Sequence, residues 1–325
     1  DDPPPELEDN LGTELFKFVV ETRTEKASTL DETYDEIAAK RESLVEHARS
    51  HGYEVLAAGL HPSARWDEHD HIDKPRYTKQ LRRIGYPQWR NITAGLHVHV
   101  GMDDPDKAVW VADEVRRYLP LFLALSANSP FWYGRDTGLR SARAVVFENL
   151  PNTGMPTAFG SWEEFSRFES RMVEEGSIVD RGEIWWDVRP NSEYGTVEIR
   201  APDSQTDLER SYGFAVLARS LVLELSRRYE EGASATDVRR ELLDENKWRA
   251  LRHGHDATFL RVDRSSGTVG VEEMLYETLD EVEIRSSDRD YVESLLSESG
   301  TRRQIEAYNQ GGMEEVLESV RVSPP

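Results

Sequence analysis

Alternating apolar and polar positions mark a short β-strand in the first third of the chain. In Gly95–Gly101 (GLHVHVG), three apolar residues alternate with His97 and His99. Successive side chains of a strand point to opposite faces, so both imidazoles are expected on one face, about 6.6 Å apart. They could meet there around one ion or substrate, although an edge strand with a polar face has the same pattern.

A second run repeats this alternation with charged side chains. In Thr196–Arg200 (TVEIR), Glu198 and Arg200 share one face and two apolar residues share the other. A carboxylate and a guanidinium are costly to bury without partners, so surface placement would explain this strand taken alone. Taken together, the two strands predict one sheet with an apolar face and a functional face.

The same periodicities divide the rest of the chain into strands and helices. Further strands are predicted at Leu15–Val20, Val55–Gly59, Ile92–Val100 and Ile184–Arg189, and a long loop at Trp66–Arg90. Helices are predicted over Leu30–His51 with Gly52 as C-cap, from Asp104-Pro105 onward, from Ser161 to Glu175 with Glu164 in a capping box, and after Asp207 with breaks near Gly232, Gly254 and Ser265–Gly267. We therefore predict a single α+β domain over 1–325, with a sheet-bearing catalytic part (1–231) and a helical C-terminal part (232–325).

The charge of the chain restricts its partners. Its 325 residues carry a formal net charge of −22, which argues against nucleic acid or an anionic membrane as the main partner. Seven lysines stand against thirty-three arginines, and acidity with so little lysine indicates adaptation to concentrated salt. An ordinary acidic cytosolic protein is the alternative.

Two absences narrow the chemistry and the location. The chain has no cysteine, which excludes disulfides, thiolate metal sites and a cysteine nucleophile. Its longest apolar run, Tyr118–Leu125, is far too short to span a membrane. We expect a cytoplasmic protein that acts on small molecules, and the sequence allows a homo-oligomer.

Acidic and basic residues supply candidate ligands for the functional face. Glu14 and Glu21 are seven positions apart, so a regular strand would place them on opposite faces unless it bends. Carboxylates and neutral imidazoles are reasonable ligands of Mg²⁺ or Mn²⁺. Arg143, Arg189 and Arg200 are candidates to clamp a phosphate or carboxylate, although each alone could be a surface arginine. Since Trp185 and Trp186 are adjacent, one of them is expected in the core.

Assembled in order, several stretches resemble the carboxylate–amine ligase family, also called the second glutamate–cysteine ligase family. They are AAGLHP (57–62), DKPRY (73–77), AGLHVHVG (94–101), LALSANSPFW (123–132), TGLRSAR (137–143), WWDVRP (185–190) and GTVEIRAPD (195–203). The acidic composition, with ENLPNTGMP and LLDENKWRALRHGHDA, is most similar to the haloarchaeal members.

The resemblance implies a glutamine-synthetase-like fold, in which a curved and mainly antiparallel sheet with flanking helices cups the site. Similar enzymes use ATP and Mg²⁺ (or Mn²⁺) to phosphorylate the γ-carboxylate of glutamate. The amine of cysteine then attacks the acyl phosphate to give γ-glutamylcysteine. The residues leave open a ligase with another amine, a metal-dependent hydrolase built on His-x-His, and a non-catalytic binding protein.

The resemblance also implies roles for individual residues. Its positions suggest Glu14, Glu21, His97 and Glu198 as metal or metal–nucleotide ligands, Arg200 with Glu198 as catalytic residues, Arg143 for the glutamate carboxylate, and His99, Trp185 and Arg189 lining the site. Relatives carry G-x-E-x-E on a strand before these residues, and no such strand precedes Glu14 here. Because the chain starts at Asp1, we expect the natural protein to carry such a segment upstream.

Overall fold

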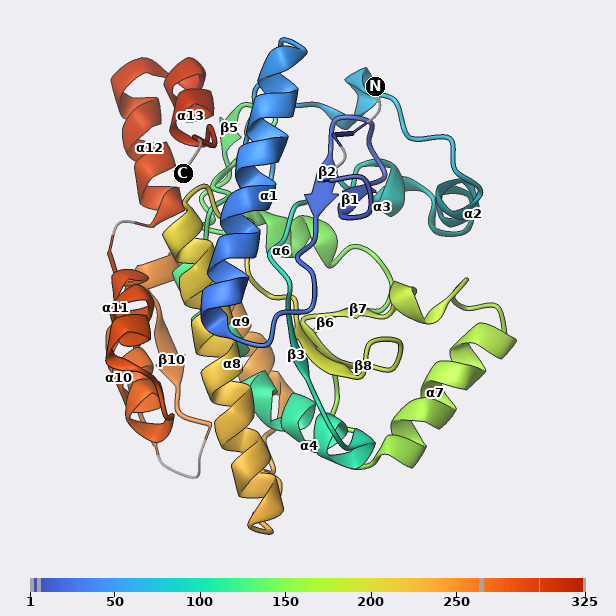
Figure 1. Cartoon of the computed structure of the whole chain (residues 1–325), viewed down its shortest axis with the longest axis vertical. Coiled ribbons are helices and arrows are strands. Elements are labelled where there is room, and N and C mark those ends of the chain that lie inside the picture. Colours follow the sequence, from blue (N-terminus) through green and yellow to red (C-terminus); the bar gives the residue numbers. More distant parts are fainter. Residues whose placement is uncertain (1–2, 5–6, 263–265, 298, 324–325) are drawn as a thin grey trace.

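Helices surround a small antiparallel sheet in the computed structural model (Figure 1), which describes residues 3–4, 7–262, 266–297 and 299–323. The strands are β1 Leu11–Thr13, β2 Val20–Thr22, β3 Val98–Gly101, β4 Phe131–Trp132, β5 Arg135–Asp136, β6 Thr153–Gly154, β7 Trp185–Trp186, β8 Val188–Asn191, β9 Thr196–Ile199, β10 Thr258–Leu260 and β11 Thr268–Gly270. The helices are α1 Leu30–Ser50, α2 Pro75–Ile84, α3 Tyr86–Trp89, α4 Pro105–Val115, α5 Leu119–Ser126, α6 Ala142–Phe147, α7 Trp162–Glu174, α8 Leu208–Glu230, α9 Arg240–His253, α10 Val271–Glu281, α11 Ser286–Ser294, α12 Gly300–Gly311 and α13 Met313–Ser319. The predicted mixture of helices and strands is confirmed.

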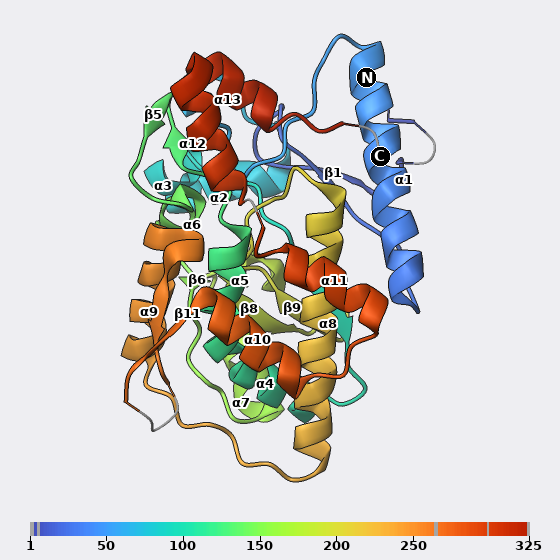
Figure 2. The same ribbon diagram turned by 90° about the vertical axis from the view of Figure 1, so that its left-hand side faces the viewer.

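The central sheet has the order β3-β9-β8, and both pairings are antiparallel. Its register aligns Val98 with Ile199 and Ile199 with Val188, so apolar side chains gather on one face. That face packs against α4 and α8, which lie beside the strands in Figure 2. The opposite face is left to the polar residues of the same strands, as the alternation predicts.

Capping residues set the helix starts that the sequence predicts. Asp104 accepts a hydrogen bond from the backbone N–H of Lys107, and Ser161 caps α7 in the same way. Thr29 forms a complete capping box before α1. That helix ends at His51, and Gly52 follows with φ +78°, a conformation that glycine adopts without strain.

The strand predicted at Leu15–Val20 is wrong. Residues 15–19 lie in the turn of a hairpin between β1 and β2, in which Gly12 pairs with Glu21, and Val20 begins β2. Leu15 and Phe16 are buried, but they pack from the turn rather than from a strand. Apolar content alone cannot distinguish a buried turn from a short strand.

Two other early segments also differ from the prediction. Trp66–Arg90 is not one loop, since it contains a 3₁₀ turn at Trp66–Glu68 and the helices α2 and α3. Pro75 at the first helical position and Gly85 at the helix end were available signals. Val55–Gly59 is extended but bonds to the distant residues Val320 and Asn128 rather than forming a strand of the sheet.

The strand predicted at Ile184–Arg189 splits at Asp187 into β7, which pairs in parallel with β6, and β8. The stretch after Asp207 is less helical than predicted, because β10 and β11 form a hairpin. The breaks near Gly232 and Gly254 are confirmed, whereas the break at Ser265–Gly267 lies partly outside the described residues.

The predicted curved sheet is not observed among the described residues. Sheets there have two or three strands, and the central one has three. The two predicted parts share one core, because Leu243 and Leu275 pack in the same cluster as Val111 and Val197.

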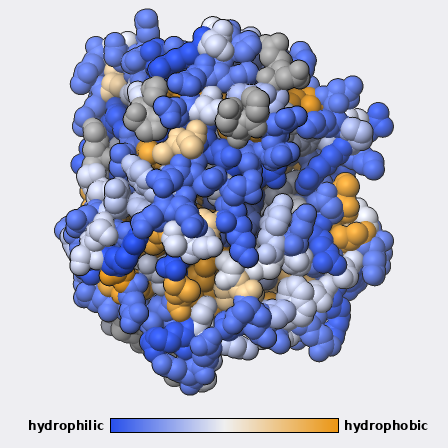
Figure 3. Space-filling view, in the orientation of Figure 1, coloured by the Kyte–Doolittle hydropathy of each residue, from blue (hydrophilic) through white to orange (hydrophobic). Residues whose placement is uncertain are grey.

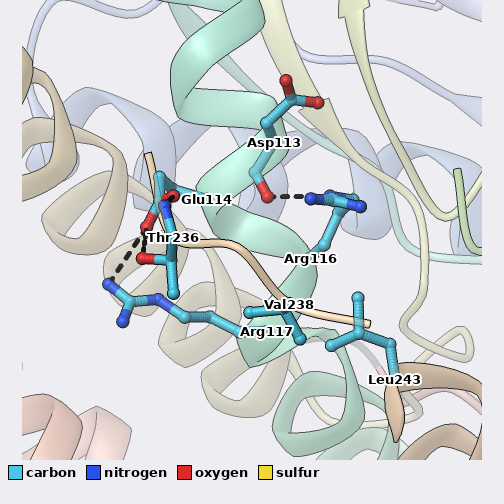
Figure 4. A pocket seen from close by; sticks show the side chains of 7 residues that line it. All are labelled: Asp113, Glu114, Arg116, Arg117, Thr236, Val238 and Leu243. Atoms are coloured by element: carbon cyan, nitrogen blue, oxygen red, sulfur yellow. Dashed lines mark hydrogen bonds and ion pairs between the residues drawn. The ribbon is translucent and has the colours of Figure 1, made fainter. Parts of the chain in front are cut away.

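The link after α8 is tied to α4 by polar contacts (Figure 4). Thr236 donates to Glu114 through its backbone N–H at 2.6 Å and its hydroxyl at 2.8 Å, and Arg117 lies 3.4 Å from the same carboxylate. Arg116 donates to the backbone carbonyl of Asp113 at 2.8 Å. The two bonds of Thr236 fasten the start of the C-terminal part to the helix that supports the sheet.

Most of the molecular face in Figure 3 is hydrophilic, and its apolar residues are scattered in small patches. This distribution agrees with the high charge of the chain. Among the described residues, every helix is too short or too polar to cross a membrane.

Candidate active site

A row of three charged or polar side chains crosses the polar face of the central sheet. The register places Glu198 opposite His99 on one side and Arg189 on the other. Glu198 Oε2 accepts hydrogen bonds from Arg189 Nε at 2.7 Å and Asn191 Nδ2 at 2.9 Å. Its Oε1 accepts from Arg200 and lies 3.6 Å from His99 Nε2. The buried carboxylate thus holds two guanidinium groups together.

The charge of Glu198 is set by these neighbours. Burial raises the pKa of a carboxyl, but Arg200 and then Arg189 outweigh it and hold the pKa of Glu198 well below its usual range. Glu198 is only 1% exposed, so it is a fully ionised interior group. A buried carboxylate with two arginines leaves one positive charge in excess on this face.

Both histidines of the GLHVHVG stretch reach this site. His97 lies just before β3, where its Nδ1 is 3.4 Å from Arg200 Nη1 and 3.8 Å from Glu21 Oε1. His99 Nδ1 lies 3.0 Å from the hydroxyl of Thr196. Burial, with Arg200 nearby, lowers the pKa of both imidazoles, and most strongly that of His97. Neutral imidazoles are the form that can accept a hydrogen bond or bind a metal.

The hairpin of β1 and β2 explains how Glu14 and Glu21, seven positions apart, reach the same region. Because the chain reverses between them, both carboxyl groups come to the same part of the molecule. Burial raises the pKa of Glu14 to about 7, the Glu21 carboxylate adds to the rise, and Arg200 and Arg76 oppose it. Two carboxyl groups that repel each other beside a neutral imidazole have the donor chemistry of a divalent cation site.

These residues fit a divalent cation in part. Glu14, Glu21 and His97 supply suitable donors, whereas both oxygens of Glu198 already accept from Arg189, Arg200 and Asn191. Within the described residues, no three such groups converge closely enough to form a closed metal site. An open site agrees with Mg²⁺, which keeps water or substrate oxygens among its ligands.

Arg143 bonds to the backbone at the end of β9 rather than to the side chains of this row. Its guanidinium donates to the carbonyl groups of Ala201 at 3.0 Å and Arg200 at 3.2 Å, and lies 3.7 Å from Asp203. A Cβ at Gly95 would approach Arg143 Nη2 to 2.2 Å, so any larger residue here would displace the guanidinium. Arg143 therefore supports the end of β9, and its predicted contact with substrate stays a prediction.

Trp185 is less closely connected to the other predicted residues. It lies on β7, where its backbone N–H donates to the carbonyl of Asn152 at 2.8 Å. Its half-buried ring faces Phe147, with 6.5 Å between ring centroids. A role in lining the site stays a prediction.

Sequence reasoning missed three groups around the site. Asn191 was not among the predicted site residues, although it donates a hydrogen bond to Glu198. Tyr77 and Lys74, from DKPRY, donate to Thr13 at 2.5 Å each and fasten α2 to the β1–β2 hairpin. Lys247 was not among the predicted site residues and is buried against two carboxylates. The Pro-containing start of α2 could have revealed the second group, whereas nothing local predicts the third.

The excess positive charge beside two carboxylates and a neutral imidazole is typical of enzymes that bind and transfer phosphoryl groups with a divalent cation. Comparison with known proteins agrees with this class. The model of glutamate–cysteine ligase family 2 matches residues 2–317, and the chain belongs to that family.

Curated relatives and a solved structure extend the match. The chain is 57% identical over 318 residues to a glutamate–cysteine ligase of Haloferax volcanii, covering 98% of this chain and 87% of the relative. It is 54% identical over 322 residues to one of Natronomonas pharaonis, covering 99% and 87%. A crystal structure of glutamate–cysteine ligase from Francisella tularensis in complex with AMP has a TM-score of 0.70 at 12% identity, covering 96% of this chain and 80% of that one. The family resemblance is therefore confirmed, and the last comparison shows the shared fold.

Proposed function

We propose that this protein is an ATP-dependent glutamate–cysteine ligase that joins the γ-carboxylate of glutamate to the amine of cysteine. The observation that carries the proposal is the unit of Arg189, Glu198 and Arg200 on one sheet face, with Glu14 and Glu21 nearby. Its curated relatives at 50–57% identity bear the name glutamate–cysteine ligase, which supports both substrates.

The chemistry runs in two steps. The γ-carboxylate oxygen of glutamate takes the terminal phosphoryl group of ATP, and ADP leaves. The amine of cysteine then attacks the acyl carbon, phosphate leaves, and the nitrogen loses a proton. Charge develops on phosphate oxygens in the first step, so fixed cations matter more than a protein nucleophile. A chain without cysteine suits this chemistry.

Arg200 is the residue that we assign to the transferred phosphate. Its guanidinium is oriented by Glu198, which also holds Arg189, so it needs little reorganisation when negative charge develops. Glu14, Glu21 and His97 would hold the divalent cation, which neutralises phosphate charge when bound. Glu198 fits the role of holding the arginines better than that of a metal ligand, because both its oxygens are engaged.

Nucleotide use draws support from the Francisella tularensis enzyme, whose structure contains AMP. We also infer one ligase domain over 1–325 with a glutamine-synthetase-like fold, supported by the antiparallel order β3-β9-β8. A cytoplasmic location and a homo-oligomer stay predictions of the sequence.

The test is an ADP-release assay with glutamate, ATP and Mg²⁺ in molar KCl, with the product identified by mass. Cysteine should give γ-glutamylcysteine, and turnover with it should exceed that with other amines. Faster ligation of another amine would assign the protein to a different carboxylate–amine ligation. Hydrolysis that needs a metal but no ATP would support the His-x-His hydrolase instead.

A further inference from the structure

A buried lysine joins two carboxylates directly behind the candidate active site. Lys247, on α9, is in contact with Asp187 and with Glu148. Its side chain is 7% exposed, and the side chains of Asp187 and Glu148 are 11% and 36% exposed. All seven lysines lie in the described part of the chain, and only Lys107 and Lys247 are buried. In a chain so poor in lysine, this position stands out.

Asp187 connects the lysine to the strand that carries Arg200. It occupies the break between β7 and β8, where its backbone N–H donates to the carbonyl of Gly154 at 3.0 Å. Its own carbonyl accepts the backbone N–H of Arg200 at 2.8 Å. The position of the Asp187 peptide therefore fixes the point at which the Arg200 side chain leaves the sheet.

Glu148 connects the lysine to Arg200 through a second segment, the helix α6. It caps the C-terminal end of α6, the helix that carries Arg143. Arg143 donates to the carbonyl groups of Arg200 and Ala201. Through its two carboxylate partners, Lys247 thus binds both segments that hold Arg200.

We propose that Lys247 is a positioning residue for ligation, which holds Asp187 and Glu148 in place and thereby orients Arg200 toward the transferred phosphate. This inference rests on the proposed function. It assigns the C-terminal part of the chain a role in the reaction, because the ammonium group of Lys247 comes from α9. Lys247 itself does not touch the substrate.

Removal of the cation would change the ionisation of its partners. Burial raises the pKa of Glu148, the charges of Asp187 and Asp244 add to the rise, and Lys247 opposes it. Asp187 also faces the buried cation of Arg143. In Lys247→Met, two carboxylates share a buried space and repel each other, so one of them takes up a proton as the pH falls. Repulsion and displacement should then be greatest at high pH.

The first experiment compares turnover against pH for three forms of the full chain at saturating substrates. Lys247→Met should lose at least about tenfold in kcat, because small displacements of a reacting group are costly, and the loss should deepen as pH rises. The triple variant Lys247→Met, Glu148→Gln, Asp187→Asn removes the repulsion between the carboxylates but does not restore the ion pairs with Lys247. Its kcat should stay at least about tenfold below wild type without the added pH dependence, and it keeps the test valid if Lys247→Met does not fold.

Lys107 provides a matched control on α4. Its side chain is also 7% exposed, and it contacts two carboxylates, Asp103 at 2.8 Å and Glu230 at 2.5 Å. Lys107→Met should lower the melting temperature but leave kcat and its pH profile unchanged. An equal change in kcat for both lysine variants would overturn the proposal, since a merely structural role would explain it.

The second experiment does not depend on activity. Hydrogen–deuterium exchange in the segment 196–203 reports the bond from the Arg200 N–H to the Asp187 carbonyl. Exchange there should be at least about tenfold faster in the triple variant than in wild type and unchanged in Lys107→Met. Unchanged exchange with wild-type kcat would overturn the inference. If exchange is faster in the triple variant but the wild type ligates no amine, the proposed function is refuted. The structural part of the inference, that Lys247 holds the backbone at Arg200, then remains supported.

Discussion

Replacement of Glu198 by glutamine is the sharpest test of the site. The side chain keeps its shape but loses its charge, and its amide N–H₂ then faces Arg189 or Arg200, which are themselves donors. The two guanidinium groups are 10% and 11% exposed, so water cannot replace the lost carboxylate fully. Two cations then remain close together without their shared anion.

The magnitude follows from this geometry. Breaking a buried ion pair by removing one partner costs about 3–5 kcal/mol. Unfolding entropy of about 2.1 cal/mol/K per residue converts this, for 325 residues, to a melting temperature lower by about 4–7 °C. Turnover should fall at least about a hundredfold, because a fixed electrostatic group at the reacting phosphate is lost. Arg200→Ala should lose turnover to a similar degree with the fold intact.

The assay is ADP release at saturating substrate, with the melting temperature measured on the same samples. Glu224→Gln is the matched control, since Glu224 also lies between two arginines, Arg227 at 2.8 Å and Arg228 at 2.7 Å, but on the helix α8. Its turnover should stay within about twofold of wild type, because Arg227 is 55% exposed and no candidate site residue is involved. Near wild-type turnover in Glu198→Gln, or equal losses in both variants, would refute the role of this row.

Three further outcomes are expected. His97→Ala should raise the Mg²⁺ or Mn²⁺ concentration needed for half-maximal activity more than His99→Ala does, and unchanged midpoints in both would favour a plain polar strand. Without divalent cation, the folded state binds a proton at Glu14 more tightly than the unfolded chain does, so the melting temperature should fall as the pH rises from about 4.5 to about 7, and Glu14→Gln should abolish this fall. Activity and melting temperature of the wild type should rise from dilute buffer to molar KCl, and a flat or falling curve would contradict adaptation to salt.

The contacts that the sequence predicts are those that follow from strand alternation. His99, Glu198 and Arg189 meet because a two-residue period places them on one face, and antiparallel pairing then aligns them. Helix caps such as Asp104 and Ser161 were likewise predicted from a few neighbouring positions. Local rules suffice where the interaction itself is local or repeats along a strand.

The positions that the sequence did not predict depend on tertiary contacts between distant parts of the chain. Leu15 and Phe16 are as apolar as strand residues, and only the tertiary structure shows that they form a turn. Lys247 lies 60 positions from Asp187 and 99 from Glu148, so no window of sequence contains the bridge. Its helix has polar residues on several sides, so periodicity does not identify the buried position of this lysine.

Salt affects the long-range field of the net charge and the short-range contacts inside the site differently. The net charge of −22 repels ATP and glutamate, which are anions, but this long-range field is screened over about 3 Å at molar salt. The contacts inside the site are of that same length, with Arg189 at 2.7 Å and Asn191 at 2.9 Å from Glu198, and burial excludes the screening ions from between the partners. Concentrated salt thus removes the repulsion that keeps anionic substrates away but leaves the local positive charge of Arg189 and Arg200, to which we assign their binding. An acidic surface and a phosphate-binding site are therefore compatible in one chain, provided that the cations of the site are held by buried carboxylates.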